Sequence, residues 1–315
     1  MLREFFLALS HARWAQDLIT RFPPAWSMAS RFISGQNAAE AISVIRGLNG
    51  KGLHVTLDFL GESVTTRAEA TRAADEYVST LGQIAASGVR ANVSLKLTQF
   101  GLKLDPRFCL DNVRRVVDQA RTAGTFLRVD MEDTPHTDQT LAVVRDLRAE
   151  YANVGVVLQA YLYRTEQDLT ALTDAHIPIR LCKGAYQEPA DKAFPRKADV
   201  DENFIKLTRL LLDRAAVTPP PADGRFPPLA ALATHDEKMI MAAQQYAAEK
   251  AVPRDRFEFQ MLFGIRRELQ EQLVRDGYAV RVYVPYGTHW YPYFMRRLAE
   301  RPANIWFFIS NYFRR

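Results

Sequence analysis

The sequence of 315 residues predicts an α/β fold in which eight strands alternate with helices. Eight short, apolar and often β-branched runs recur along the chain, and a segment of helical periodicity follows each of them. Hydrophobic residues make up 48% of the chain, which is enough for a large buried core. Strands separated by helices pair in parallel through right-handed crossovers, and eight such units match a closed (β/α)8 barrel. A doubly wound open sheet is the alternative.

The N-terminal residues are predicted to form helices that precede the barrel. Two stretches with apolar residues at helical spacing, 5–18 and 38–45, are separated by Pro23-Pro24, which breaks a helix. We therefore expect an N-terminal helical segment, 1–48, packed on a barrel formed by residues 49–315.

The predicted barrel elements follow one another without a low-complexity segment. The expected strands are 53–60, 91–97, 126–131, 154–160, 177–182, 229–233, 257–262 and 279–284. The expected helices are 67–84, 111–123, 139–150, 166–175, 202–215, 237–250 and 266–276, with a further helix that begins at Pro292. The proline-rich stretch 217–228 is expected to be a surface loop before the sixth strand.

Composition argues against several classes of protein. Lys and Arg exceed Asp and Glu by 41 to 36, a surplus too small to indicate nucleic-acid binding. The two cysteines are far apart and form no CxxC pair, which indicates a reducing compartment without a disulfide framework. No apolar stretch reaches the roughly 18 residues of a membrane span, and the N-terminal apolar run is too short for a secretion signal. We expect a cytoplasmic protein that is at most peripheral at the inner face of the membrane.

Polar residues stand at nearly every predicted strand end, where catalytic residues of such barrels lie. Lys96, Arg180 and Arg281 fall inside apolar strands, and a buried charge needs a partner. Asp130 and Glu132 are the candidate partners. Ion pairs that only stabilise the barrel can explain any one residue, but the whole set indicates a large polar ligand across the barrel mouth. The set is Asp58, Glu62, Lys96, Asp130, Glu132, Gln159, Arg180, Lys183, Thr234, His235, Gln260, Arg281 and Tyr283.

Two adjacent arginines, Arg296 and Arg297, follow the last strand in the helix expected from Pro292. Neighbouring helical residues point about 100° apart, so the pair can hold a small anion from two sides. Tyr293 lies three and four residues before them and shares their face. Because arginine matches a carboxylate bidentately, the group predicts a pocket for a small carboxylate. A solvated basic face is the alternative.

Metal and dinucleotide sites of the common kinds are not indicated. The chain has six histidines and neither HxH nor HExxH, so a metal-dependent hydrolase is disfavoured and we expect no metal. Gly50-Lys51-Gly52 precedes the first strand and lacks the third glycine of a dinucleotide-binding loop.

Two other chemistries stay open from the residues alone. A strand lysine can form a Schiff base, and Lys96 and Lys183 qualify by position. A phosphate group could also bind at the barrel mouth. The cations and backbone donors for it would come from Arg180, Lys183, Gly184, Thr234 and His235.

Seven segments together resemble the bacterial proline dehydrogenases, across residues 53 to 300. They are VSLKLTQFG, RVDMED, VVLQAYLYR, IRLCKGAY, LATHDEK, FEFQMLFG and RVYVPYGTHWYPYFMRRL. The length is similar to that of the compact monofunctional enzymes. The resemblance implies a distorted (βα)8 TIM-type barrel that binds FAD noncovalently, with a C-terminal helix over its mouth.

The same resemblance implies an activity and partners. The enzyme would oxidise L-proline to Δ1-pyrroline-5-carboxylate by hydride transfer to flavin N5, the first step of proline degradation to glutamate. Electrons would pass to membrane quinone, and the product to a separate pyrroline-5-carboxylate dehydrogenase. The C-terminal IWFFISNYFRR is either a helix packed on the barrel or a contact with quinone or the membrane surface.

The resemblance also assigns roles to residues. Glu62 is the expected gate, which pairs with Arg296 when the last helix closes over substrate. The substrate residues are Lys96, Asp130, Leu262, Tyr283, Tyr293, Arg296 and Arg297. The cofactor residues are Gln159, Arg180, Cys182, Lys183, Gly184, Ala185, Thr234 and His235. This chain has Gln187 where the bifunctional relatives have tryptophan after GAY, which leaves the adenine-side contacts open.

Overall fold

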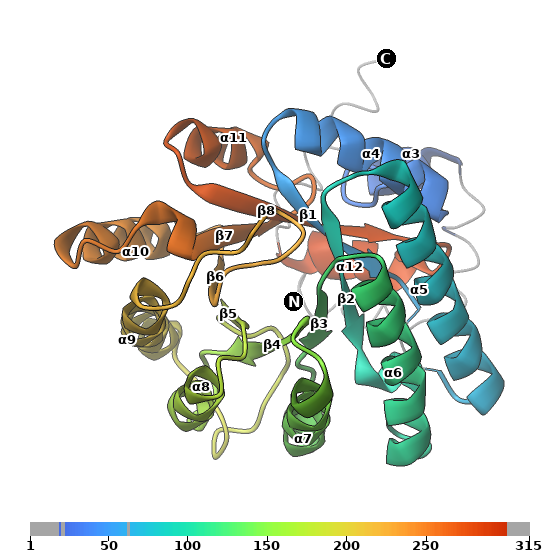
Figure 1. The fold of residues 1–315 in the computed structure, drawn as a ribbon, viewed down its shortest axis with the longest axis horizontal. Helices are drawn as coiled ribbons and strands as arrows, with labels where there is room; N and C mark the ends of the chain where they lie inside the picture. Colours follow the sequence, from blue (N-terminus) through green and yellow to red (C-terminus); the bar gives the residue numbers. More distant parts are fainter. Residues whose placement is uncertain (1–18, 20–22, 62–63, 301–315) are drawn as a thin grey trace.

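The computed structural model describes residue 19 and residues 23–61 and 64–300 of the chain. Within them the eight expected strands form one closed barrel, in which each strand pairs in parallel with its neighbour in the chain and β8 pairs with β1 (Figure 1). The predicted closed barrel is therefore confirmed, and the open-sheet alternative is wrong. The strands are β1 (His54–Phe59), β2 (Ala91–Lys96), β3 (Leu127–Asp130), β4 (Val154–Gln159), β5 (Ile179–Cys182), β6 (Ala230–Ala233), β7 (Phe257–Leu262) and β8 (Ala279–Tyr286).

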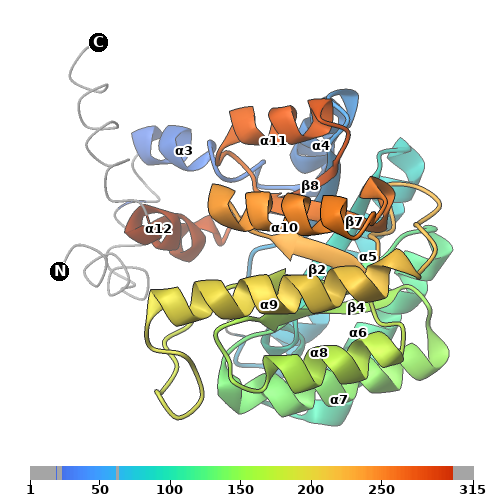
Figure 2. The ribbon, with the colours of Figure 1, turned by 90° about the vertical axis from the view of Figure 1, so that its left-hand side faces the viewer.

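Helices surround the barrel, and two of them lie together beyond one end of it (Figures 1 and 2). The helices that cover the strands are α4 (Ala38–Gly50), α5 (Arg67–Ser87), α6 (Pro106–Thr122), α7 (Thr134–Glu150), α8 (Thr165–Asp174), α9 (Lys197–Ala216), α10 (Glu237–Glu249) and α11 (Arg267–Arg275). The pair at the end is α3 (Pro23–Ala29) and α12 (Trp290–Glu300), and two short 3-10 turns are η1 (Leu97–Phe100) and η2 (Arg254–Arg256). No helix of the described residues is long and apolar enough to cross a membrane.

The strand boundaries agree with the sequence prediction to within two residues, but several helices start earlier. α7 and α9 open with the polar turns TPHTD and KADVD, where apolar periodicity gives no signal. α6 begins at Pro106, because Asp105 caps the backbone N–H groups of residues 107 and 108. α12 begins at Trp290, two residues before the expected start, since proline is tolerated in a first turn. The division at residue 48 stays a prediction.

The two faces of the barrel strands differ in chemistry. Outward side chains such as Val55 and Leu57 are fully buried beneath the helices and belong to the main hydrophobic core. Inward side chains are largely polar and bond one another, as Thr56 does with Asn92 at 2.6 Å. A barrel interior is more often filled by branched apolar residues. The polar filling fixes the strands to one another by directional bonds, at both ends of the barrel.

Arg281 lies at the amino end of the barrel, away from the mouth. It pairs with Glu258 at 2.8 Å, and both side chains are buried. The expectation that Asp130 or Glu132 would be its partner is wrong, because Asp130 ends β3 at the opposite end. Glu132 instead accepts hydrogen bonds from the backbone N–H and hydroxyl of Thr98.

The proline-rich stretch 217–228 is more than a surface loop. Arg281 Nη1 donates to the Gly224 carbonyl at 3.0 Å, and Asn92 Nδ2 donates to the Arg225 carbonyl at 3.1 Å. Gly224 and Pro227 are buried. The polar barrel interior thus binds this loop across the amino ends of the strands, which its proline content alone did not indicate.

Residues 30–36, which we call the N-terminal strap, follow α3 in the chain and form hydrogen bonds at the end of β8. Ser34 donates from its backbone and its hydroxyl to the Pro285 carbonyl, and Gly287 N–H donates to the Gly35 carbonyl at 3.0 Å. The strap passes so close to Gly264 that a Cβ there would lie 1.8 Å from the Arg31 carbonyl oxygen. A separate hydrophobic cluster fastens α3 to α12.

Candidate active site

A cavity of about 510 Å³ opens at the carboxyl ends of the strands. Side chains from β2 to β8 and from α12 line it, so the strand ends converge as the sequence predicted. The lining residues are Lys96, Asp130, Met131, Val157, Gln159, Arg180, Cys182, Lys183, Gly184, Ala185, Tyr186, Ala233, Thr234, His235, Gln260, Met261, Leu262, Tyr283 and Arg297.

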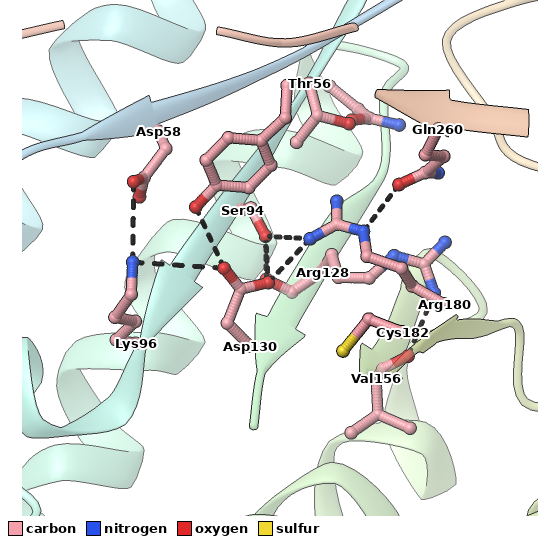
Figure 3. A network of polar contacts seen from close by, with 12 residues as sticks. Thr56, Asp58, Ser94, Lys96, Arg128, Asp130, Val156, Arg180, Cys182 and Gln260 are labelled. Carbon is pink, nitrogen blue, oxygen red and sulfur yellow. Dashed lines mark hydrogen bonds and ion pairs between the residues drawn. The ribbon is translucent and has the colours of Figure 1, made fainter. Parts of the chain in front are cut away.

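Asp130 is the centre of the polar network in this cavity. Its carboxylate accepts hydrogen bonds from Arg180 Nη1 at 2.8 Å, Ser94 Oγ at 2.5 Å and Tyr283 OH at 2.9 Å. Lys96 Nζ lies 3.9 Å away, on the side of Asp130 opposite to Arg180 (Figure 3). Lys96 and Asp130 are register partners on adjacent strands, so the pairing of β2 with β3 sets this contact.

Tyr283 serves as a neutral donor. Burial, together with the nearby carboxylates of Asp130 and Asp58, raises the pKa of its hydroxyl well above the ordinary value. Its ring also lies beneath the Arg180 guanidinium, 5.1 Å from Cζ to the ring centroid. The tyrosine therefore supports both members of the Asp130–Arg180 pair.

Arg180 is almost fully buried, and the described protein atoms satisfy only some of its hydrogen-bond donors. Its Nε donates to Gln260 Oε1 at 2.5 Å and its Nη1 to Asp130, but its buried Nη2 has no hydrogen-bond partner among the described residues. A buried guanidinium nitrogen without an acceptor costs stability. Because Arg180 lines the cavity, this nitrogen is suited to a ligand that brings an acceptor.

Two carboxylates of the described residues lie near the Lys96 ammonium. Asp58 Oδ2 lies 3.4 Å from Nζ, closer than Asp130. The predicted partner Asp130 is thus confirmed for Lys96 and Arg180, whereas the nearer contact to Asp58 was not predicted. An ammonium between two carboxylates is held protonated, which disfavours a Schiff-base role.

The loop after β5 forms one wall of the cavity. Gly184 has φ +119°, and a Cβ there would lie 2.4 Å from the Tyr161 ring, so glycine is required. Lys183 Nζ bonds Asp201 at 2.5 Å and Asp236 at 2.8 Å, which keeps the lysine at the edge of the cavity. Burial raises the pKa of the Cys182 thiol to about 12, so this cysteine is not a nucleophile at neutral pH.

Further lining side chains come from β4 and β6, which flank β5 in the barrel, and from β7. His235 Nε2 accepts the Leu262 N–H at 2.9 Å, which places the proton of a neutral ring on Nδ1. Thr234 Oγ1 accepts the Asp236 N–H at 3.0 Å, and Gln159 Nε2 donates to the Glu132 carbonyl at 2.8 Å. These bonds fix the side chains that face the cavity.

Helix α12 brings a further cation to the cavity. Arg297 lines it, with its guanidinium 5.1 Å from the centroid of the Tyr293 ring, as their helical spacing predicted. Tyr293 is buried in the α3–α12 cluster, and half-buried Arg296 is not among the lining residues. The expected gate, Glu62, lies outside the described residues.

Gln260, which lines the cavity, and Asp58, which lies behind Lys96, belong to the predicted set of polar residues at the strand ends. Neither of them was assigned a specific role from the sequence, because those roles depend on which strands are neighbours. No sequence signal pointed to five other lining residues, which are Met131, Val157, Tyr186, Ala233 and Met261. Within the described ranges no cluster of three or more His, Cys, Asp or Glu side chains is placed to hold a metal ion.

Comparisons with known proteins agree with this geometry. A sequence model of the family described as Proline dehydrogenase matches residues 41–308. Proline dehydrogenase 2 of Bacillus subtilis is 41% identical over 97% of this chain and 96% of its own length. Proline dehydrogenase of Deinococcus radiodurans is 40% identical over 90% of each chain.

A solved structure has the same fold. Proline utilization A (PutA) from Bdellovibrio bacteriovorus, inactivated by N-propargylglycine, superposes with a TM-score of 0.78 at 26% identity. The match covers 87% of this chain and 32% of that one, so this chain spans about a third of the length of that larger protein.

Proposed function

Because the chain belongs to the proline dehydrogenase family of oxidoreductases, we propose that it oxidises L-proline to Δ1-pyrroline-5-carboxylate with noncovalently bound FAD. One observation supports this most directly. Three cations from β2, β5 and α12 line one cavity together with a buried carboxylate, Asp130, and the hydroxyl of Tyr283. That arrangement suits a small amino acid whose carboxylate needs cations and whose ring needs apolar walls.

The substrate part of the proposal assigns two kinds of contact. Lys96, Arg296 and Arg297 hold the carboxylate of proline by charge-assisted hydrogen bonds. Leu262, Tyr283 and Tyr293 enclose the ring. The carboxylate of Asp130 compensates the positive charges of Lys96 and Arg180 in the cavity. Glu62 acts as the gate that pairs with Arg296 on closure.

The residues of the cavity fit a flavin. Arg180 Nη2 is a buried donor that needs an acceptor, and the carbonyl- and nitrogen-rich edge of a flavin offers acceptors. Gly184 and Ala185 line the cavity on the loop after β5, and a glycine lets a ligand such as a phosphate approach the backbone closely. The proposed cofactor residues are Gln159, Arg180, Cys182, Lys183, Gly184, Ala185, Thr234 and His235.

When bound, the flavin supplies a two-electron acceptor at its N5. Proline loses the hydride from C5 and the proton from its nitrogen, and the C5–N bond becomes a double bond. Lys96 and Arg297 orient the substrate for this step, while α12 excludes water from it. Because these cations stand on rigid strands and on a packed helix, they can hold the substrate in one orientation.

The proposal includes the later fate of the electrons and product. Membrane quinone reoxidises the cofactor, and a separate pyrroline-5-carboxylate dehydrogenase consumes the product. Because the quinone lies in the membrane, the enzyme must contact the membrane surface at least transiently. The apolar, basic segment 305–315, outside the described residues, is the candidate for this contact.

The test begins with the colour of the purified protein. Bound oxidised flavin absorbs near roughly 450 nm, as a cofactor signature. We expect anaerobic L-proline to bleach this band, and a soluble quinone to restore it. A folded, colourless protein that FAD does not reconstitute would contradict the proposal. Borohydride trapping of substrate on Lys96 would instead support the Schiff-base alternative.

A further inference from the structure

Asp58 is a buried carboxylate placed directly behind the ammonium of Lys96. Its side chain is 2% exposed and does not line the cavity, while Lys96 does. In the parallel register of β1 and β2, Asp58 is the partner of Ser94, two residues before Lys96. Asp58 therefore contacts the ammonium from the barrel interior, while Lys96 itself lines the cavity.

The nearby Asp130 cannot take over this role from its present position. Its carboxylate already accepts hydrogen bonds from Arg180, Ser94 and Tyr283, and it lies 3.9 Å from Lys96, against 3.4 Å for Asp58. Asp130 thus compensates Arg180 first. Of the carboxylates in the described ranges, Asp58 is the nearer to Lys96 Nζ, and Figure 3 shows the ammonium between the two acids.

Tyr77 of α5 fixes the position of Asp58. Its hydroxyl lies 3.3 Å from Asp58 Oδ1 and donates to the Ser94 carbonyl at 2.7 Å. The same hydroxyl accepts the Phe59 N–H at 3.2 Å. A fully buried tyrosine from outside the barrel thus joins the ends of β1 and β2 beside the carboxylate.

We propose that Asp58 is a positioning residue, which holds the Lys96 ammonium charged and aimed at the carboxylate of the substrate. This inference rests on the proposed function. It predicts that Asp58 acts only through Lys96 and only on substrates that carry a carboxylate.

The experiment compares Asp58→Asn with the unchanged enzyme on two substrates, L-proline and L-prolinamide, which lacks the carboxylate. We expect kcat/KM for L-proline to fall at least about 30-fold, the lower range for breaking a buried charge pair. We expect kcat/KM for L-prolinamide to change less than about 3-fold, on the same scale. Equal losses on both substrates would overturn the proposal. Asp213→Asn, which removes a surface acid bonded to Tyr246, is the control.

A double variant gives an independent readout. In a Lys96→Met background, Asp58→Asn should cost nothing further in kcat/KM for L-proline, because the residue through which it acts is gone. Losses that multiply would show a structural role and overturn the proposal. Flavin content and circular dichroism of each variant establish that it is folded.

Tyr77→Phe decides the question if Asp58→Asn does not fold. It keeps both charges and removes the hydroxyl beside Asp58, so we expect about a 3-fold or larger loss with L-proline and none with L-prolinamide. An unchanged kcat/KM for L-proline would count against the inference. If the unchanged enzyme fails to oxidise L-proline, the proposed function itself fails, and the two failures are distinct.

Discussion

Asp130 illustrates how single residues set the chemistry of this cavity. One carboxylate bonds Arg180, Ser94 and Tyr283, and it also lies within ion-pair distance of Lys96. Removing it would leave a buried guanidinium without a carboxylate, which is costly. The residue therefore balances charge for both the substrate side and the proposed cofactor side of the cavity.

Arg297 is the residue whose loss should separate substrate binding from cofactor binding. We expect Arg297→Met to retain flavin but to lower kcat/KM for L-proline by roughly 30-fold or more, the cost of losing a charged partner in a desolvated site. Steady-state kinetics and the flavin-to-protein ratio measure the two effects. Arg254→Met removes an arginine stacked in the same way on Tyr278 and should leave both unchanged. A normal kcat/KM in Arg297→Met would remove Arg297 from the substrate site.

At the residue scale, the sequence was most informative where a polar or charged side chain stands in an apolar strand. Lys96, Arg180 and Tyr283 stood out in apolar strands, and the structure brings them to one cavity. The partner of Arg281 was wrong, because a strand position does not reveal which residue of a neighbouring strand lies opposite. Asp58 was missed as the nearer partner of Lys96 for the same reason.

Helix α12 is an element whose position depends on a distant part of the chain. It carries Arg297, and its aromatic residues pack against α3, with Trp26 and Trp290 rings 5.6 Å apart. The N-terminal strap adds backbone hydrogen bonds to Pro285 and Gly287, just before the helix begins. The geometry of the cavity therefore depends on residues that do not touch it.

Gly264 tests this dependence. It has φ +78°, and a Cβ there would meet the Arg31 carbonyl at 1.8 Å, so Gly264→Ala must displace the strap. We expect a loss of about 1–3 kcal/mol in the free energy of unfolding, together with a higher KM for L-proline. Denaturant unfolding and kinetics measure these quantities.

Gly88→Ala is the matched control for Gly264→Ala. Gly88 has φ +68° with nothing within 4 Å of a Cβ, so it carries the backbone strain without the clash. It should lower stability by about 1 kcal/mol without changing KM. An equal change of KM in both variants would disprove a link between the strap and the site.

At the scale of elements, the strands were predicted better than the helices. Each strand is a short apolar run bounded by polar residues, so its ends are visible in the sequence. Helices such as α7 and α9 begin with polar turns whose caps and tertiary contacts, not periodicity, fix the start. The contact of α3 with α12 joins distant segments and was not specified beyond helices that pack on the barrel.

The whole molecule is a barrel with a polar interior and an apolar exterior beneath its helices. The sequence predicted eight units because the alternation of strands and helices is a local pattern. It did not predict that the loop 217–228 covers the amino end of the barrel, since the hydrogen bonds that hold it, from Arg281 and Asn92, come from distant strands.

This buried amino end predicts a pH dependence of stability. Burial and the nearby Arg281 lower the pKa of His54 below 6.5, although Glu258 opposes the shift. As pH falls below about 6.5, the unfolded chain takes up a proton at this histidine before the folded chain does. The free energy of unfolding should therefore decrease from pH 7 toward pH 5, as urea denaturation can measure.

Substitution of the histidine gives the control. His54→Gln should flatten the decrease, whereas His176→Asn, at an exposed position, should not. A slope that is unchanged in His54→Gln would assign the acid sensitivity to other groups.

The pairing of β1 with β8 and of α3 with α12 has a consequence for synthesis on the ribosome. Val55 and Arg281 are bonded across the closing seam although they are 226 residues apart in the chain. One edge of β1 therefore stays unpaired until β8 has been synthesised and has left the ribosome. We expect folding to end in one late, slow closing event, which completes the barrel and fixes the arginine-bearing helix at nearly the same time.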